Sequence, residues 1–192
     1  MRIDYGKQNI FPKDFFSVTN ALKKKFLTQG KSVELFEQKI KSFVKSKYAI
    51  VCNSGTSALH LALLSIDIKK NDVILMPAIN FIAAYNMSIS LGAKVFLVDV
   101  DPITGQMTPE KLLKTIKQNK LNKIKAVITM YLGGSPENVY SFYKIKKKFK
   151  CKLIEDACHA FGSTYKIDKK NYYIGSCTHA DISTFSFHPL KT

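Results

Sequence analysis

The chain has 192 residues, 46% of them hydrophobic, and its 30 basic residues against 14 acidic ones give a net charge of +16. This length and apolar content suffice for one domain of ordinary size with its own core. The charge is carried by lysine, with Arg2 as the single arginine, and arginine is the usual reader of bases and phosphates. We therefore expect no nucleic-acid partner, and a basic nucleic-acid-binding protein is the less favoured alternative.

Helix-like and strand-like segments alternate along the chain, and the pattern predicts an α/β fold in three layers, with helices on both faces of a mostly parallel sheet. The helix over residues 56–65 is apolar almost all round, so we expect it to be buried. The expected elements, in chain order, are helices at 13–25 and 32–46, strand 48–52, helix 56–65, strand 73–76, helix 79–91, strand 94–98, helix 109–118, strand 126–130, helix 137–149, strand 152–155, a loop or hairpin over 165–177, and strand 182–187.

No apolar run reaches the length of a membrane span, and Met1–Gly6 contains no apolar signal segment. We therefore expect a soluble, cytoplasmic protein without a membrane partner. The four cysteines form no Cys-x-x-Cys pair, and four ligands at metal spacing do not occur. Reduced thiols and no bound metal are the expectation.

A phosphate-binding loop is the first candidate site. Gly55, Thr56 and Ser57 stand between an expected strand and an expected helix. The glycine allows a ligand to approach the backbone, the two hydroxyls can donate, and the helix N-terminus offers free N–H groups. An N-capped core helix explains the same residues equally well.

Asp156 and His159 form the second candidate site. Asp156 stands at the C-terminal end of an apolar strand, where ligands bind in open α/β sheets. An aspartate there could pair with the protonated pyridine nitrogen of a cofactor, and His159 could contact its ring oxygen. A helix N-cap and a satisfied core histidine are the competing interpretations.

The last candidates are Ser186, Lys191 and Phe81. Ser186 and Lys191 are five residues apart at the end of the last expected strand, where a serine could bind phosphate and a lysine could carry pyridoxal 5'-phosphate (PLP) as a Schiff base. Phe81 follows the strand that ends at Pro77 and could stack on a flat cofactor ring, although a core aromatic is the simpler interpretation.

Taken together, these motifs resemble the DegT/DnrJ/EryC1/StrS family of sugar-nucleotide aminotransferases, which have the aspartate aminotransferase fold. The resemblance covers the whole chain. The segments that carry it are Phe26–Gly30, Asn53–His60, Pro77–Asn86, Gly92–Pro102, Glu155–Ala160 and Ser186–Lys191.

The resemblance implies roles for single residues. Lys191 would be the catalytic lysine that holds PLP, Asp156 the partner of the pyridine nitrogen, and Phe81 the stacking ring. His159 occupies a position that is Gln or His in the family. Relatives with histidine in place of this lysine act as dehydratases, so the lysine favours transamination. The residues that would hold the phosphate are Gly55, Thr56, Ser57 and Ser186.

The resemblance also implies the reaction and the partners. An amino group would pass from an amino donor, glutamate, to a 4-keto-6-deoxy sugar nucleotide for surface-glycan synthesis, in a homodimer. Within the family, the motifs look most like the transaminases of pseudaminic acid biosynthesis. In those relatives Tyr5, Lys25 and Thr28 would lie near the substrate.

The chain departs from the family pattern in two ways. The segment 166–177 is longer than usual and is expected to be a surface insertion. In addition, 1–192 corresponds to an N-terminal segment and most of the large, PLP-binding domain, without the small C-terminal domain. In the family a further strand lies between the strand at 48–52 and the last strand present here. We therefore expect a truncated chain with two unpaired strand edges, which alone folds poorly or binds PLP weakly. An inactive fragment is the alternative to an active enzyme.

Overall fold

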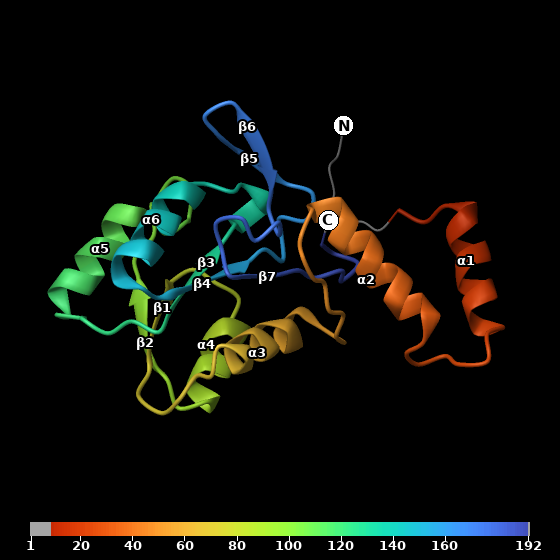
Figure 1. Cartoon of the computed structure of the whole chain (residues 1–192), viewed down its shortest axis with the longest axis horizontal. Coiled ribbons are helices and arrows are strands. Elements are labelled where there is room, and N and C mark those ends of the chain that lie inside the picture. The colour runs from red at the N-terminus through yellow and green to blue at the C-terminus, as the bar shows by residue number, and fades with distance from the viewer. Residues whose placement is uncertain (1–8, 192) are drawn as a thin grey trace.

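A computed structural model describes residues 9–191, and a five-stranded sheet forms their centre (Figure 1). The strand order is β2-β1-β3-β4-β7, and all neighbouring pairs are parallel. The carboxyl ends of all strands therefore meet at one edge, the usual place for a ligand in such sheets. The strands are β1 (Val73–Pro77), β2 (Lys94–Val98), β3 (Ala126–Met130), β4 (Lys152–Asp156) and β7 (Ile182–Thr184).

Helices cover both faces of this sheet, which confirms the predicted three-layer architecture. Helices α3 (Gly55–Ser65) and α4 (Ala83–Ser90) pack on one face, and α5 (Pro109–Gln118) and α6 (Val139–Phe149) on the other (Figure 1). The central strand β3 is buried along its whole length. Its continuous apolar sequence follows from being covered on both faces.

Two helices precede the sheet and lie at the end of the molecule opposite to α5 (Figure 1). These are α1 (Pro12–Leu22) and α2 (Lys31–Val44). Both were expected to run slightly further. Helix α2 ends where Lys45 adopts a left-handed conformation with φ of 59°, a common way to close a helix. Helix α1 buries none of its side chains within residues 9–191. No helix in the described part of the chain is long and apolar enough to cross a membrane.

The segment expected to be a loop or hairpin is a hairpin. Strands β5 (Thr164–Ile167) and β6 (Lys170–Tyr173) pair in antiparallel register across a two-residue turn. The first residue of the turn, Asp168, has φ of 53°, as tight hairpin turns require. The hairpin projects from the body of the molecule (Figure 1), in keeping with a surface insertion.

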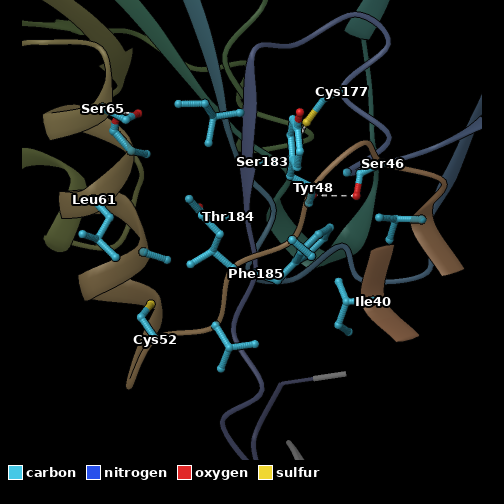
Figure 2. Close-up of a pocket in the computed structure, with 18 of the residues that line it drawn as sticks. Ile40, Ser46, Tyr48, Cys52, Leu61, Ser65, Cys177, Ser183, Thr184 and Phe185 are labelled. Atoms are coloured by element: carbon cyan, nitrogen blue, oxygen red, sulfur yellow. Dashed lines mark hydrogen bonds between the residues drawn. The ribbon is translucent and has the colours of Figure 1, made fainter. Parts of the chain in front are cut away.

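The expected strand at 48–52 is wrong. These residues are extended but not paired, and within residues 9–191 they make no backbone–backbone hydrogen bond. The N–H of Val51 instead donates to Oε1 of Glu37 at 2.9 Å. The segment faces β7 across a groove of about 590 Å³ (Figure 2). The apolar sequence of a strand is present, but no neighbouring strand edge is close enough to pair with it.

Three further expectations need correction. Helix 56–65 is not buried all round, because Leu61 borders the groove and is 47% exposed. The helix expected over 79–91 begins only at Ala83, since Ala78 still donates its N–H to Val98 beside the sheet and the chain then has to turn. The strand expected over 182–187 ends at Thr184, because Phe185 turns away to pack edge-on against Phe161.

Candidate active site

Asp156 ends β4 at the carboxyl edge of the sheet and is only 2% exposed. The N–H of Cys158 donates to its Oδ1 atom at 3.2 Å. Burial raises the pKa of Asp156, and the bond from Cys158 and the charges of His159 and Lys191 lower it in part. No lysine or arginine forms an ion pair with this carboxyl group within residues 9–191. The site thus contains a buried acid without an ion-pair partner among the described residues.

Lys191 and His159 meet beside this acid. The Nζ atom of Lys191 lies 2.7 Å from Nε2 of His159. The two residues are brought together by the turn after β4 and by the turn at the end of the chain, in which the Lys191 N–H donates to His188 O at 2.7 Å. Burial and the Lys191 charge lower the pKa of His159, and Asp156 raises it. The structure therefore brings Lys191 and His159, predicted from separate motifs, together, and their chemical roles stay predictions.

The start of α3 packs against the segment that follows β7. Ser54 caps the helix, with its Oγ accepting the Ser57 N–H at 3.1 Å. A Cβ atom added at Gly55 would lie 3.1 Å from Cys158 Sγ and 3.3 Å from Ser186 Cβ. Glycine is therefore the residue that lets the helix start approach this closely. The N-cap interpretation is confirmed, and it is compatible with a phosphate site at the same helix end.

The other candidate residues for cofactor binding lie near the start of α3 and at the carboxyl edge of the sheet. Within residues 9–191 the N–H groups of Gly55 and Thr56 have no acceptor, so they remain available to an anion. The hydroxyl of Ser57 lies 3.0 Å from that of Ser54. Phe81 follows β1 at the same sheet edge and is 63% exposed, so it is not the core aromatic of the simpler interpretation. Its stacking role stays a prediction.

The structure does not bring the expected substrate residues to the cluster. Lys25 and Thr28 are exposed in the connection between α1 and α2. No hydrogen bond or ion pair between described residues joins them to Asp156, His159 or Lys191. Tyr5 lies outside the described residues. The three substrate contacts stay predictions.

Sequence reasoning missed a second buried carboxyl group, that of Glu155. It is 2% exposed and accepts a hydrogen bond from Tyr131 Oη at 2.9 Å. Ser183 of β7 also donates to it. An acid in an otherwise apolar strand, directly before Asp156, was the available signal. Among the described residues no group of three or more metal-ligating side chains is placed to hold a metal ion.

Comparison with known proteins identifies the family. A model of the DegT/DnrJ/EryC1/StrS aminotransferase family matches residues 9–192. The chain belongs to this family. The resemblance seen in the sequence motifs is therefore confirmed.

The relatives of this chain include two enzymes that are named for nucleotide-linked sugars. The UDP-4-amino-4,6-dideoxy-N-acetyl-beta-L-altrosamine transaminase of Campylobacter jejuni is 39% identical over 98% of this chain and 48% of its own length. The GDP-perosamine synthase of Escherichia coli is 36% identical over 86% of this chain and 43% of its own length. The chain thus spans about half the length of the curated relatives it matches.

Solved structures of the family share the fold. PseC of Helicobacter pylori, an aminotransferase involved in pseudoaminic acid biosynthesis, superposes with a TM-score of 0.81 at 28% identity, over 98% of this chain and 48% of PseC. NtdA of Bacillus subtilis, with bound cofactor PMP, gives a TM-score of 0.80 at 28% identity, over 95% of this chain and 40% of NtdA. The three-layer fold inferred from the sequence is the fold of these aminotransferases.

Proposed function

We propose that this chain provides the cofactor site of a PLP-dependent aminotransferase that transfers an amino group to a keto-sugar nucleotide. The observation that carries the proposal is the convergence of Asp156, His159 and Lys191 at the carboxyl edge of the sheet, beside the start of α3. Membership of an aminotransferase family supports assigning this cluster to cofactor binding.

The residues present fit PLP. The buried Asp156 has no cationic partner within the described chain, which suits a protonated ring nitrogen. Gly55 lets the start of α3 lie against Ser186, where a side chain would be too close to its neighbours. With Thr56, Ser57 and Ser186 it would hold the phosphate at the N-terminus of α3. Phe81 would cover one face of the ring, and His159 would bind at its edge.

Lys191 is the residue to which we assign the chemistry. When bound, PLP supplies an electron sink that makes the α-hydrogen of an amino acid labile. The Nζ atom of Lys191 would move the proton at this α-carbon, as general base and then as general acid. His159, at 2.7 Å, keeps the amine at a fixed place in the site.

The substrates and the assembly belong to the same proposal. The names of the relatives support a sugar nucleotide as acceptor, and a 4-keto-6-deoxy sugar of the pseudaminic acid type is the acceptor that we favour. Glutamate as donor, a homodimeric state and a cytoplasmic location stay predictions. So does the assignment of 1–192 to an N-terminal segment and most of a PLP-binding large domain.

The test begins with the 192-residue chain and PLP. The proposed site predicts a yellow species in the visible spectrum, and reduction with borohydride followed by peptide mapping should then place the added mass on Lys191. The matched control is Lys191→Ala, which leaves 28 other lysines in the chain and should lose the specific adduct.

Each outcome separates the proposal from its alternative. A specific adduct on Lys191 would justify assays with keto-sugar nucleotides and glutamate. A colourless protein, or label spread over surface lysines with no preference for Lys191, would contradict the proposed site and favour a non-catalytic chain.

A further inference from the structure

Glu155 is a buried acid that the proposed chemistry does not use. It precedes Asp156 on β4, and successive residues of a strand point to opposite faces. Both side chains are 2% exposed. Within residues 9–191, no lysine, arginine or histidine forms an ion pair with Glu155. Hydrogen bonds, together with the nearby charge of Lys146, must therefore stabilise its ionised form.

Two donors from two different segments supply those bonds. The Tyr131 hydroxyl, directly after β3, donates to Oε1 at 2.9 Å. The Ser183 hydroxyl, in the middle of β7, donates to Oε2. One carboxylate thus joins the end of β3, β4 and β7, and a glutamine, which has a single acceptor oxygen, could not accept at both positions.

Strand β7 depends on side-chain contacts more than the other strands do. It pairs with β4 through only three residues, and its other edge borders the groove (Figure 2). The chain then leads from Thr184 directly to Ser186 and Lys191. A Cβ atom added at Gly175 would collide with the ring of Phe185, so the hairpin loop is packed against the residue that follows β7.

We propose that Glu155 is a positioning residue, whose carboxylate holds β7 on β4 and thereby fixes Ser186 and Lys191 opposite Asp156. The effect on PLP binding rests on the proposed function, whereas the role of Glu155 in holding β7 does not. Burial raises the pKa of Glu155, and the bonds from Ser183 and Tyr131 lower it. The donors therefore favour the charged form that can accept from both of them.

The donors can be removed one at a time, which separates positioning from general stability. Ser183→Ala removes the tie to β7, whereas Tyr131→Phe removes only the tie to β3. A hydrogen bond to a charged group contributes enough to change an equilibrium by about tenfold. Hydrogen exchange of residues 182–187 is measured without PLP, and the dissociation constant of PLP is measured by absorbance, both on the 192-residue chain.

We expect Ser183→Ala to speed exchange in 182–187 and to weaken PLP binding, each by about tenfold. Tyr131→Phe should leave both values within about twofold, and Ser183→Thr, which keeps a hydroxyl, should restore them. Glu155→Gln should behave like Ser183→Ala. The proposal is overturned if Ser183→Ala changes neither value, or if Tyr131→Phe changes both to the same extent.

The same data distinguish this proposal from the proposed function. If the unmodified chain does not bind PLP, the proposed function fails for this chain. The exchange rates of Ser183→Ala, Ser183→Thr and Tyr131→Phe then decide alone whether Glu155 positions β7. If PLP binds and exchange in 182–187 is unaffected by Ser183→Ala, the function stands and the positioning role is refuted.

Discussion

Lys191 and His159 lie 32 positions apart in sequence, yet 2.7 Å separates Lys191 Nζ from His159 Nε2. Which of the two nitrogen atoms donates depends on the tautomer of the imidazole. Burial lowers the pKa of His159 most, the Lys191 charge lowers it further, and Asp156 raises it. The ionisation of His159 therefore reports on both neighbours.

Replacing either neighbour should shift the pKa of His159 in opposite directions. Lys191→Ala removes a nearby positive charge and should raise that pKa, whereas Asp156→Asn removes a negative charge and should lower it. An NMR titration of the histidine ring protons measures both shifts, with His159→Gln identifying the resonance among four histidines. Shifts of the same sign in the two variants would show that the cluster does not form in solution.

Asp156 should make the cofactor-free protein less stable at neutral pH. Burial raises its pKa in the folded state, so the folded chain keeps a proton that the unfolded chain releases near pH 4. The folded state then binds more protons, and stability falls as pH rises from about 4 to the raised pKa. Asp156→Asn should therefore gain stability above this window, by about 2–4 °C in Tm, which corresponds to ~1 kcal/mol.

Thermal unfolding between pH 4 and 8 measures this effect. The control is Asp99→Asn, because Asp99 is exposed and its hydrogen bond with Lys111 lowers its pKa. That variant should gain no stability at neutral pH. An equal gain for Asp156→Asn at every pH would rule out titration as the cause.

Gly55→Ala should damage the site through contact rather than through backbone strain. The added Cβ would lie 3.1 Å from Cys158 Sγ and 3.3 Å from Ser186 Cβ. Overpacking of this kind costs about 1–3 kcal/mol, and it would also push α3 away from Ser186. We expect a lower Tm and weaker PLP binding.

The double variant Gly55→Ala, Cys158→Ala tests the cause. Removing Sγ gives the new methyl group room, so the two changes should couple and the double variant should recover part of the loss. Additive losses would mean that the Gly55 side of the site does not touch Cys158 in solution.

The sequence predicted most of the sheet because its signals are local. Strands β2 and β3 were expected with the bounds that the structure shows, since both are short, largely apolar runs between turn residues. Residues 48–52 have the same local signal, with Ile50 and Val51, but Ile50 is 82% exposed. Pairing depends on a neighbouring strand edge, and no local pattern can report whether one is there.

The candidate site also combines residues that local motifs predict with residues whose role depends on tertiary contacts. Asp156, His159 and Lys191 belong to short motifs that carry their chemistry in the sequence itself. The role of Glu155 depends on Tyr131 and Ser183, which lie 24 and 28 positions away. Likewise, β7 was expected to extend to Phe187, but Phe187 packs edge-on against Phe36 of α2. Such partners are set by tertiary packing, and a single sequence contains no signal for them.

The hairpin β5–β6 should loosen as the pH falls below about 6.5. His179 is 9% exposed, and its Nδ1 lies 2.6 Å from the Tyr165 hydroxyl on β5. Burial lowers the pKa of His179, and the charge of Lys146 lowers it further. As the pH falls below about 6.5, the unfolded chain therefore binds a proton at this histidine and the folded chain does not. Stability is lost as the pH falls from about 6.5 toward the lowered pKa.

His179→Phe should reduce this loss while keeping an aromatic ring against Tyr140 and Tyr143 of α6. His188→Phe, at an exposed position, is the matched control and should leave the loss unchanged. Thermal unfolding from pH 5 to 7 gives the stability, and hydrogen exchange of residues 164–173 reports on the hairpin itself. If the acid loss and the faster exchange persist in His179→Phe, the group that titrates is His159 or another histidine, and His179 only fills space beneath the hairpin.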